Sequence, residues 1–205
     1  MKPAWSSAVT LDGFVRSTRV SDMTLMETER LIVRNFLVGD WREVHKIIVQ
    51  YQASELAQYD HQWPTSPEEI RKITELFASG NSFLAVCLKD SNQLIGFIRL
   101  NPDEGDSQRD FSIGYVFDPD FHSRGYATEA CRAVLNRAFG QLQADRVVTG
   151  TAALNKASCR LLERLGFQKV GEEKASFRAD ENGKPIEFLG YHYVISKDEW
   201  EDRKK

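Results

Sequence analysis

The segment Tyr115–Glu129 has the residue types and the spacing that could bind a phosphate group. An apolar strand pattern ends there, Pro119 interrupts backbone pairing, and a turn through Gly125 opens the clearest amphipathic helix pattern in the chain. A helix N-terminus offers unpaired N–H groups and a partial positive charge, Gly125 lets the backbone approach a ligand closely, and Arg124 adds a cation. The segment therefore predicts a pyrophosphate site made mainly of backbone groups. A plain strand-to-helix connection is the alternative, and topology alone favours it.

The common nucleotide-binding and hydrolase motifs are missing from the sequence. It contains no G-x-x-x-x-G-K-[ST], G-x-G-x-x-G, G-x-S-x-G or H-E-x-x-H, which argues against P-loop, dinucleotide-fold, serine-hydrolase and zincin chemistry. Asp118 and Asp120 flank Pro119 like the D-x-D pair with which some glycosyltransferases hold a metal-bound nucleotide sugar. Acids in a surface turn usually serve the turn itself. A metal-dependent glycosyltransferase is therefore a distant alternative, and we expect no metal site.

The elements that must position these residues alternate between strand and helix patterns. Strands are predicted near Leu31–Val33 and at Phe83–Leu88, Leu94–Leu100, Phe111–Phe117, Arg146–Thr151, Phe167–Phe177 and Phe188–Ile195. Helices are predicted over 41–51, from a capping box at Ser66–Glu69 to about Gly80, over 127–139, and from Asn155 to Leu165 with Gly166 as its end. The predicted fold class is α/β (α+β), with a mixed, mostly antiparallel central sheet flanked by helices on both faces.

Composition and charge limit the classes of partner. With 205 residues and a formal net charge of −3, the chain reads as one domain over 26–200 without a nucleic-acid partner or a polybasic membrane contact. No apolar run approaches the roughly 20 residues that a membrane span needs. Cys87, Cys131 and Cys159 form neither a disulfide framework nor a zinc motif, which favours a reducing, cytoplasmic location. We expect residues 1–25 to be a flexible or loosely docked extension and 201–205 to be a charged tail.

Two motifs, in the expected order, resemble those of one enzyme superfamily. His122–Ala127 is similar to [Q/R]-x-x-G-x-[G/A], the acyl-CoA pyrophosphate loop of the GNAT N-acetyltransferases, although His122 replaces Gln or Arg and Ser123 replaces the common Gly. Asn155–Phe167 resembles N-x-x-S-x-x-x-x-E-x-x-G-F, a signature of the branch that contains ribosomal-protein-alanine acetyltransferases. The segments 27–31 and 193–200 also resemble that branch, so the resemblance covers about residues 27–200.

The resemblance implies transfer of an acetyl group from acetyl-CoA to a primary amine by direct attack, the acceptor being a protein N-terminus or a small molecule. It implies that the pantetheine arm lies along 112–117, where two strands separate, and pairs with backbone groups of Val116 and Phe117. An exposed N–H there could also stabilise an oxyanion. The predicted cofactor-binding residues are Val116, Phe117, Ser123, Arg124, Gly125, Tyr126, Ala127, Thr128, Asn155 and Ser158.

The resemblance also indicates a group for the leaving thiolate. Many relatives carry a Tyr at the position that is Leu162 here. Ser158, one helical turn earlier, is the catalytic candidate in its place, and the alternative is a helix Ser that bonds only to backbone. Asn155 is expected to cap the helix and to contact the pantetheine as well.

A base for the acceptor amine is harder to find. The branch sometimes carries a Glu at the position of Ser112, and without it the catalytic candidates are Glu104 and Asp110, with Asp103 beside them. A polar turn is the alternative for 101–105. At pH 7 a lysine amine costs about 4.6 kcal/mol to deprotonate, whereas an α-amine costs about 1–1.4 kcal/mol. Because no strong base is evident, we expect α-amines or small-molecule amines rather than lysine side chains.

The loop Tyr59–Thr65 combines aromatic residues with one His and one Asp, and it is predicted to form either a wall for the acceptor or a plug at the sheet edge. The segment Phe177–Glu187 reads as a hairpin with its turn at Asn182-Gly183, beside the acceptor site or in a homodimer interface. The alternative class is a non-catalytic acyl-CoA-binding module, which the missing Tyr and Glu favour.

Overall fold

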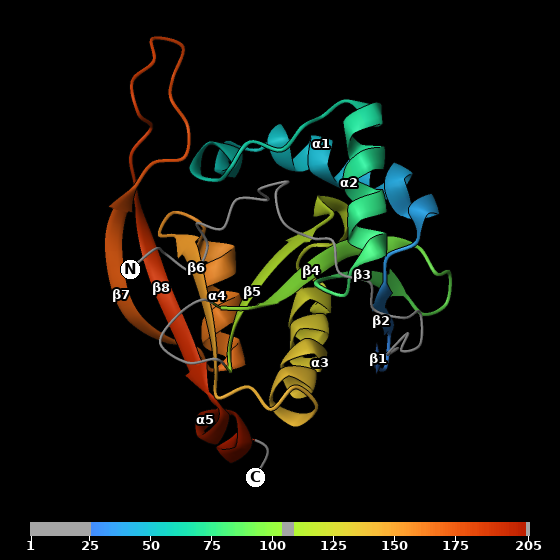
Figure 1. The fold of residues 1–205 in the computed structure, drawn as a ribbon. Coiled ribbons are helices and arrows are strands. Elements are labelled where there is room, and N and C mark those ends of the chain that lie inside the picture. Colours follow the sequence, from blue (N-terminus) through green and yellow to red (C-terminus); the bar gives the residue numbers. More distant parts are fainter. Residues whose placement is uncertain (1–25, 104–108, 204–205) are drawn as a thin grey trace.

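The computed structural model describes residues 26–103 and 109–203, which are arranged around one eight-stranded sheet (Figure 1). The strands are β1 (Met26–Glu27), β2 (Leu31–Asn35), β3 (Phe83–Leu88), β4 (Leu94–Pro102), β5 (Asp110–Phe117), β6 (Arg146–Ala152), β7 (Gln168–Ala175) and β8 (Phe188–Ser196). They lie in the order β1-β2-β3-β4-β5-β6-β8-β7, and every neighbouring pair is antiparallel except β5 and β6. The predicted mixed, mostly antiparallel sheet is confirmed.

Helices cover both faces of the sheet, as predicted. The α-helices are α1 (Trp41–Gln52), α2 (Pro67–Ser79), α3 (Tyr126–Gly140), α4 (Lys156–Leu165) and α5 (Lys197–Asp202), and the short 3-10 helices are η1 (Val38–Asp40), η2 (Glu55–Tyr59) and η3 (Pro119–Phe121). On β3, Leu84 and Val86 join the core under α3 and α4, while Ala85 and Cys87 join the core under α1 and α2. This alternation follows the two-residue period of a strand that is buried on both sides.

Local sequence signals set most helix ends. The Ser66 hydroxyl accepts from the Glu69 N–H, and Asn155 Oδ1 accepts from the Ser158 N–H at 3.1 Å, so both residues are the predicted N-caps. Gly166, with φ of 98°, ends α4 in the left-handed conformation. Helix α5 was not predicted, because its six residues are too few to show a helical period. The tail predicted from 201 therefore begins with the last turn of α5.

Strands β5 and β6 separate along their length. Their parallel pairing covers only three register pairs, from Asp110↔Arg146 to Ser112↔Val148, although both strands continue well beyond them. At the point of separation, Thr149 Oγ1 donates to the Ile113 carbonyl at 2.7 Å. The sheet thus opens between two adjacent strands in its middle, at the location that the sequence analysis proposed for a bound arm.

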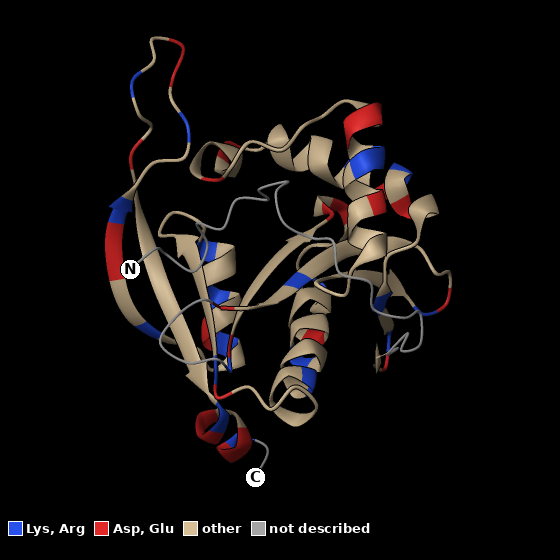
Figure 2. Ribbon diagram, in the orientation of Figure 1, with Lys and Arg blue, Asp and Glu red and all other residues tan. Residues whose placement is uncertain are grey.

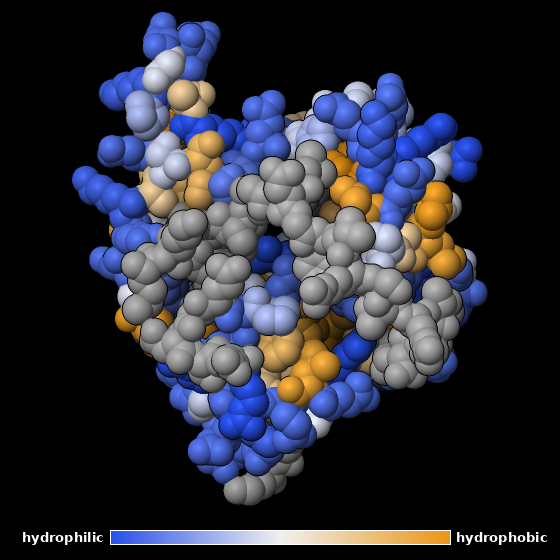
Figure 3. Space-filling model, viewed as in Figure 1, coloured by the Kyte–Doolittle hydropathy of each residue, from blue (hydrophilic) through white to orange (hydrophobic). Residues whose placement is uncertain are grey.

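The surface of the described residues carries charges of both signs. Lys, Arg, Asp and Glu are scattered over helices, loops and β7, whereas the central strands are mostly uncharged (Figure 2). In the view of Figure 3 the described surface is mostly hydrophilic, with hydrophobic residues in separate patches. Among the described residues, no helix is long and apolar enough to span a membrane. The predicted extension 1–25 lies outside the described residues.

Candidate active site

The loop before α3 is exposed at residues 122–125 and carries backbone N–H groups without a described acceptor. Ser123 and Gly125 have positive φ angles of 61° and 83°, and Gly125 is the N-cap of α3. In the described part of the chain, the N–H groups of residues 124–128 donate no hydrogen bond. Consecutive unpaired donors at the positive end of a fifteen-residue helix are groups that can bind an anion without a basic side chain.

Contacts from residues 28–30, which lie about 100 residues earlier in the sequence, hold this loop in place. Arg30 Nη1 donates to the Arg124 carbonyl at 3.0 Å, and the Arg30 guanidinium pairs with Glu129 at 2.6 Å. Thr28 Oγ1 donates to Glu129 Oε1 at 2.6 Å. Burial alone would raise the pKa of Glu129, but the hydrogen bonds from Thr28 and Arg30 outweigh it and hold that pKa below its ordinary 4.5. The segment 28–30 therefore fixes the first turn of α3.

Backbone groups of β5 face the gap between β5 and β6. The bonds Asp103 N–H to Asp110 carbonyl and Asp118 N–H to Ile95 carbonyl show that even-numbered residues of β5 pair with β4. Odd-numbered residues consequently direct their N–H and carbonyl groups toward β6, as Ile113 does. Tyr115 and Phe117 follow Ile113 into the gap, where β6 no longer pairs with them.

This register corrects the prediction for Val116. Its backbone groups face β4, where a Cβ added to Gly96 would lie 2.8 Å from the Val116 carbonyl oxygen. The backbone groups of Tyr115, not those of Val116, face the gap. Those of Phe117 also face it, as the prediction requires. His122 Nε2 donates to the Phe117 carbonyl at 3.0 Å, so the histidine that departs from the family pattern steadies the end of β5.

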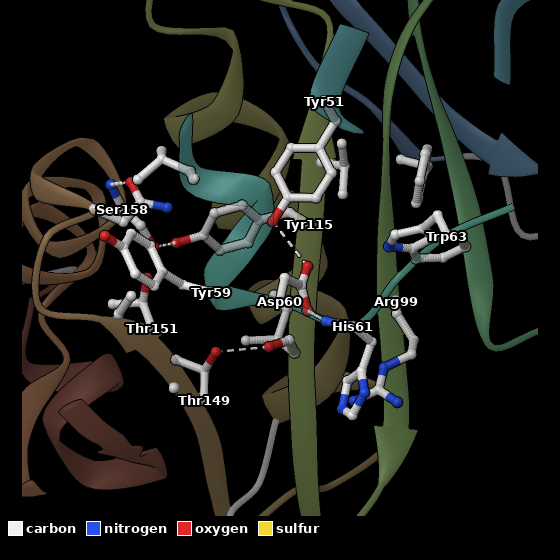
Figure 4. Close-up of a pocket in the computed structure, with 18 of the residues that line it drawn as sticks. Tyr51, Tyr59, Asp60, His61, Trp63, Arg99, Tyr115, Thr149, Thr151 and Ser158 are labelled. Atoms are coloured by element: carbon white, nitrogen blue, oxygen red, sulfur yellow. Dashed lines mark hydrogen bonds between the residues drawn. The ribbon is translucent and has the colours of Figure 1, made fainter. Parts of the chain in front are cut away.

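A pocket of about 500 Å³ opens from this gap (Figure 4). One side carries Tyr115 from β5, Thr149 and Thr151 from β6, and Asn155 and Ser158 from the start of α4. The other side is formed by α1 and the loop after η2. The pocket thus joins the separated strands to the segment predicted as the acceptor wall, and its volume lies in the range of small-molecule sites.

Ser158 forms a pair with Tyr115 inside the pocket. Their hydroxyl oxygens lie 2.8 Å apart, and the two residues come from different elements (Figure 4). Burial raises the pKa of the Tyr115 phenol above its ordinary 10.0, so the phenol stays protonated. Leu162, the position where relatives carry a Tyr, is fully buried in the core. Sequence reasoning missed Tyr115, which reaches Ser158 across 43 residues.

The loop Tyr59–Thr65 does line the pocket, through residues 59–64. Asp60 is the one carboxylate among the described lining residues. Its Oδ2 accepts from the Tyr51 hydroxyl at 2.8 Å, and its Oδ1 accepts from the His61 N–H at 2.7 Å (Figure 4). Burial, followed by the charge of Asp60, raises the pKa of the Tyr51 phenol, so Tyr51 remains a donor to this carboxylate. From the sequence, Asp60 is expected only as part of a loop that forms either an acceptor wall or a plug at the sheet edge.

The predicted bases lie elsewhere. Asp110 is buried at the closed end of the β5–β6 gap, is not among the pocket residues, and pairs with Arg146 through Nε at 3.1 Å and through Nη2. That carboxylate is committed to joining the two strands, and it does not fit the predicted role of base. Glu104 lies outside the described residues. Asp103 pairs with Asp110 through its backbone at the end of β4.

Asp118 and Asp120, the acidic pair that suggested a glycosyltransferase, form ion pairs with a lysine. Lys46 Nζ lies 2.9 Å from Asp118 Oδ2 and 2.8 Å from Asp120 Oδ2. Asp118 Oδ1 also accepts from the Asp120 N–H at 2.9 Å, which caps η3. The two acids thus serve the turn and an ion pair with α1, which supports the turn interpretation of this motif.

Comparisons with known proteins identify the family of the chain. The model of the acetyltransferase (GNAT) domain family matches residues 30–168. The N-acetyltransferase YnaD of Bacillus subtilis (strain 168) is 26% identical over 174 residues, which cover 84% of this chain and 97% of YnaD.

Solved structures share the fold. The ribosomal-protein-S5-alanine acetyltransferase of Vibrio fischeri aligns with a TM-score of 0.70 at 18% identity, over 86% of this chain and 98% of that one. The spermidine N-acetyltransferase of Vibrio cholerae, solved in complex with CoA and spermine, aligns with a TM-score of 0.69 at 17% identity, over 84% of this chain and 99% of that one. The chain therefore belongs to the acetyltransferase (GNAT) domain family and is an acetyl-CoA-dependent N-acetyltransferase.

Proposed function

We propose that this N-acetyltransferase modifies a small-molecule amine or a protein N-terminal α-amine, and that the amine attacks directly while both substrates are bound. The observation that carries the proposal is the pocket itself. It has a carboxylate, Asp60, on one side and the hydroxyl pair Tyr115–Ser158 on the other. An amine that enters from the Asp60 side would face the gap between β5 and β6.

The residues around the gap fit coenzyme A. The free N–H groups of residues 124–128 would bind its diphosphate, with Arg124 as an added cation. The backbone groups of Tyr115 and Phe117 would pair with its amide-containing arm as an additional strand does. When bound, acetyl-CoA supplies the activated acetyl group as a thioester. Val116 would line the pocket rather than pair with the arm through its backbone, which faces β4.

Ser158 and Tyr115 would hold the proton for the departing thiolate. The buried phenol, whose pKa is raised, would donate to the Ser158 oxygen 2.8 Å away, and the Ser158 hydroxyl would then donate to a thiolate near it. A thiol with an ordinary pKa near 8.5 needs little help to leave at neutral pH, so this contribution is modest. Asn155, whose side chain caps α4, fixes the backbone that carries Ser158.

Asp60 would bind the acceptor as an ammonium ion and accept its proton. Tyr51 and the His61 N–H leave lone pairs of this carboxylate available to a further donor. A lone carboxylate suits an amine that is already close to neutrality at pH 7, which favours α-amines and weakly basic small amines over lysine side chains. Asp60 replaces Glu104 and Asp110 as the base in this proposal.

The experiment is an acetyl-CoA thiol-release assay at pH 7 with a panel of amines. We expect release with α-amines and small primary amines, and slower release with a lysine ε-amine. Comparable rates on both classes would contradict the acceptor preference. If coenzyme A binds but no thiol is released with any amine, the alternative of a non-catalytic acyl-CoA-binding module would be supported. Leu162 and Ser112, which stand where the family carries Tyr and Glu, favour that alternative.

A further inference from the structure

The segment that joins β7 to β8 is fastened to the acceptor side of the pocket. In Figure 1 it rises as a hairpin beyond the ends of both strands, near the turns that connect α1 and α2. Its tip is shaped by Asp180, whose Oδ1 accepts from the N–H groups of Asn182 and Lys184, and by Gly183 with φ of 79°. Because the hairpin is ordered, the side chains on it can hold the neighbouring loop in a fixed position.

Arg178 makes the polar contacts between this hairpin and the acceptor side. Its Nε donates to the Asp60 carbonyl at 2.8 Å, and its Nη2 donates to Gln52 Oε1 at 2.8 Å and to the His61 carbonyl at 3.1 Å. The partners lie 117 to 126 residues away in sequence. One planar guanidinium thus holds the C-terminal end of α1 and two consecutive peptide groups of the loop, a geometry that a lysine ammonium cannot reproduce.

We call these three hydrogen bonds of Arg178 the clamp, and aromatic contacts lie beside it. The ring of Phe177 lies 4.2 Å from the ring of His61, and Phe188 lies 5.5 Å from Tyr59. The buried Nε2 of His61 has no hydrogen-bond partner in the described part of the chain, so its ring depends on packing for its position. Packing fixes the outer face of the loop, and Arg178 fixes its backbone.

The clamped backbone carries the carboxylate of the pocket. Asp60 accepts from Tyr51 and from the His61 N–H, and both geometries depend on where the peptide groups at 60 and 61 lie. We propose that Arg178 is a positioning residue that acts through Asp60 and sets the affinity of the enzyme for its acceptor amine. The proposal rests on the proposed function of Asp60. A displacement of about 1 Å in such a group can cost up to 100-fold in activity.

The test compares Arg178→Ala and Arg178→Lys with Lys184→Ala in the full chain. Lys184 lies on the same hairpin and is exposed, and among the described residues no hydrogen bond or ion pair joins its side chain to the loop. We expect Arg178→Ala to raise the acceptor KM about 10- to 100-fold, Arg178→Lys to give a smaller rise, and Lys184→Ala to leave it unchanged. The Kd of coenzyme A, measured by calorimetry, should change less than about twofold in all three. An unchanged acceptor KM, or a parallel loss of coenzyme A affinity, would overturn the proposal.

A double-mutant cycle separates positioning from general stability. In an Asp60→Asn background, Arg178→Ala should change the acceptor KM by less than about threefold, because the group it positions is already altered. An equal effect in both backgrounds would show that Arg178 does not act through Asp60.

Failure of the proposed function can be told apart from failure of the Arg178 proposal by a measurement that does not need activity. If the unaltered enzyme released no thiol with any amine, the acceptor assignment would fail while the clamp could still be measured. Amide hydrogen exchange over residues 57–63 should then accelerate in Arg178→Ala and not in Lys184→Ala. Unchanged exchange in both variants would overturn the clamp itself.

Discussion

At the scale of single residues, the proposed function relies on a hydroxyl pair that two distant elements bring together to assist the leaving thiolate. Tyr115 and Ser158 should act as one unit, so Tyr115→Phe and Ser158→Ala should each lower kcat on the order of 10-fold, and the double variant should be little worse than either. Steady-state kinetics with acetyl-CoA and a reactive amine measures this. Tyr191→Phe, which removes a phenol outside the pocket, is the matched control. A Tyr115→Phe enzyme with undiminished kcat would remove Tyr115 from the mechanism.

The same pair fixes the expected pH dependence. Because burial raises the pKa of Tyr115 above 10.0, the phenol remains a donor throughout the ordinary assay range. The value of kcat should rise with pH as the bound acceptor amine loses its proton, and it should not decline below about pH 10. A pH–rate profile from 6 to 9.5 tests this, and a decline between pH 8 and 9 would mean that another acid with an ordinary thiol-like or amine-like pKa is required.

Asp60 gives a prediction on the acceptor side. Asp60→Asn keeps the shape of the side chain and one oxygen that can accept from Tyr51, but it removes the charge that would bind an ammonium ion and the second acceptor that faces the His61 N–H. We expect the acceptor KM to rise about 10-fold or more, with the Kd of coenzyme A unchanged. If instead only coenzyme A affinity fell, the carboxylate would belong to the cofactor side of the pocket.

One residue of each hydrogen-bonded pair, Tyr115–Ser158 and Tyr51–Asp60, could be predicted from the sequence. Ser158 was identified because its motif is local to one helix, and the loop of Asp60 because aromatic and polar residues cluster in it. The partners Tyr115 and Tyr51 could not be found in the same way. Which phenol reaches Ser158 depends on the register of β5 and on the distance between β5 and α4, and neither leaves a local sequence pattern.

At the scale of elements, the first turn of α3 depends on residues 28–30. Glu129 accepts from Thr28 and from Arg30, and these hydrogen bonds hold its pKa below 4.5. A depressed folded-state pKa contributes stability that is present above the unfolded pKa and is lost as the pH falls through the folded value. Glu129→Gln should therefore lower the free energy of unfolding by about 1 kcal/mol at pH 7, and the difference from the unaltered chain should shrink below pH 4.5.

Urea denaturation at pH 7 and at pH 3.5 measures this difference. Glu75→Gln, an exposed substitution on α2, serves as the control and should change stability by less than about 0.5 kcal/mol at either pH. A Glu129→Gln difference that grew on acidification would show that the carboxylate is destabilised in the folded chain, which is the opposite sign.

Most elements were predictable because their signals are short-range. The caps at Ser66, Asn155 and Gly166 mark helix ends by residue type, and β3 shows the apolar run of a strand that is buried on both faces. Helix α5 was missed because a single turn and a half has no usable period, although Ser196 and Glu199 form a capping box. The backbone direction of Val116 was wrong for a related reason, since a shift of one residue reverses which groups face the gap.

At the scale of the whole molecule, the site exists only because separate parts of the chain meet around the gap. The parallel pair β5–β6 is closed at one end by Asp110 with Arg146 and by Thr149 with Ile113. The acceptor side joins α1, the loop after η2 and the β7–β8 hairpin through Arg178. The order of the elements suggested a mixed sheet, but contacts across more than a hundred residues follow only from the assembled fold. The predicted homodimer stays a prediction.

Coenzyme A binding by calorimetry tests the central claim most directly, with Gly125→Ala before α3 compared against Gly140→Ala at the other end of that helix. At Gly125, φ is 83° and an added Cβ would lie 3.3 Å from Arg30 Nη2, whereas an added Cβ at Gly140 would meet no described atom within 4 Å beyond its chain neighbours and the adjacent helix backbone. A left-handed conformation costs a non-glycine residue about 1–2 kcal/mol, which would weaken binding roughly 5- to 30-fold if the free N–H groups shift. The account predicts that loss for Gly125→Ala and unchanged affinity for Gly140→Ala. Equal affinity in both variants, or no uptake of coenzyme A by the unaltered chain, would contradict it.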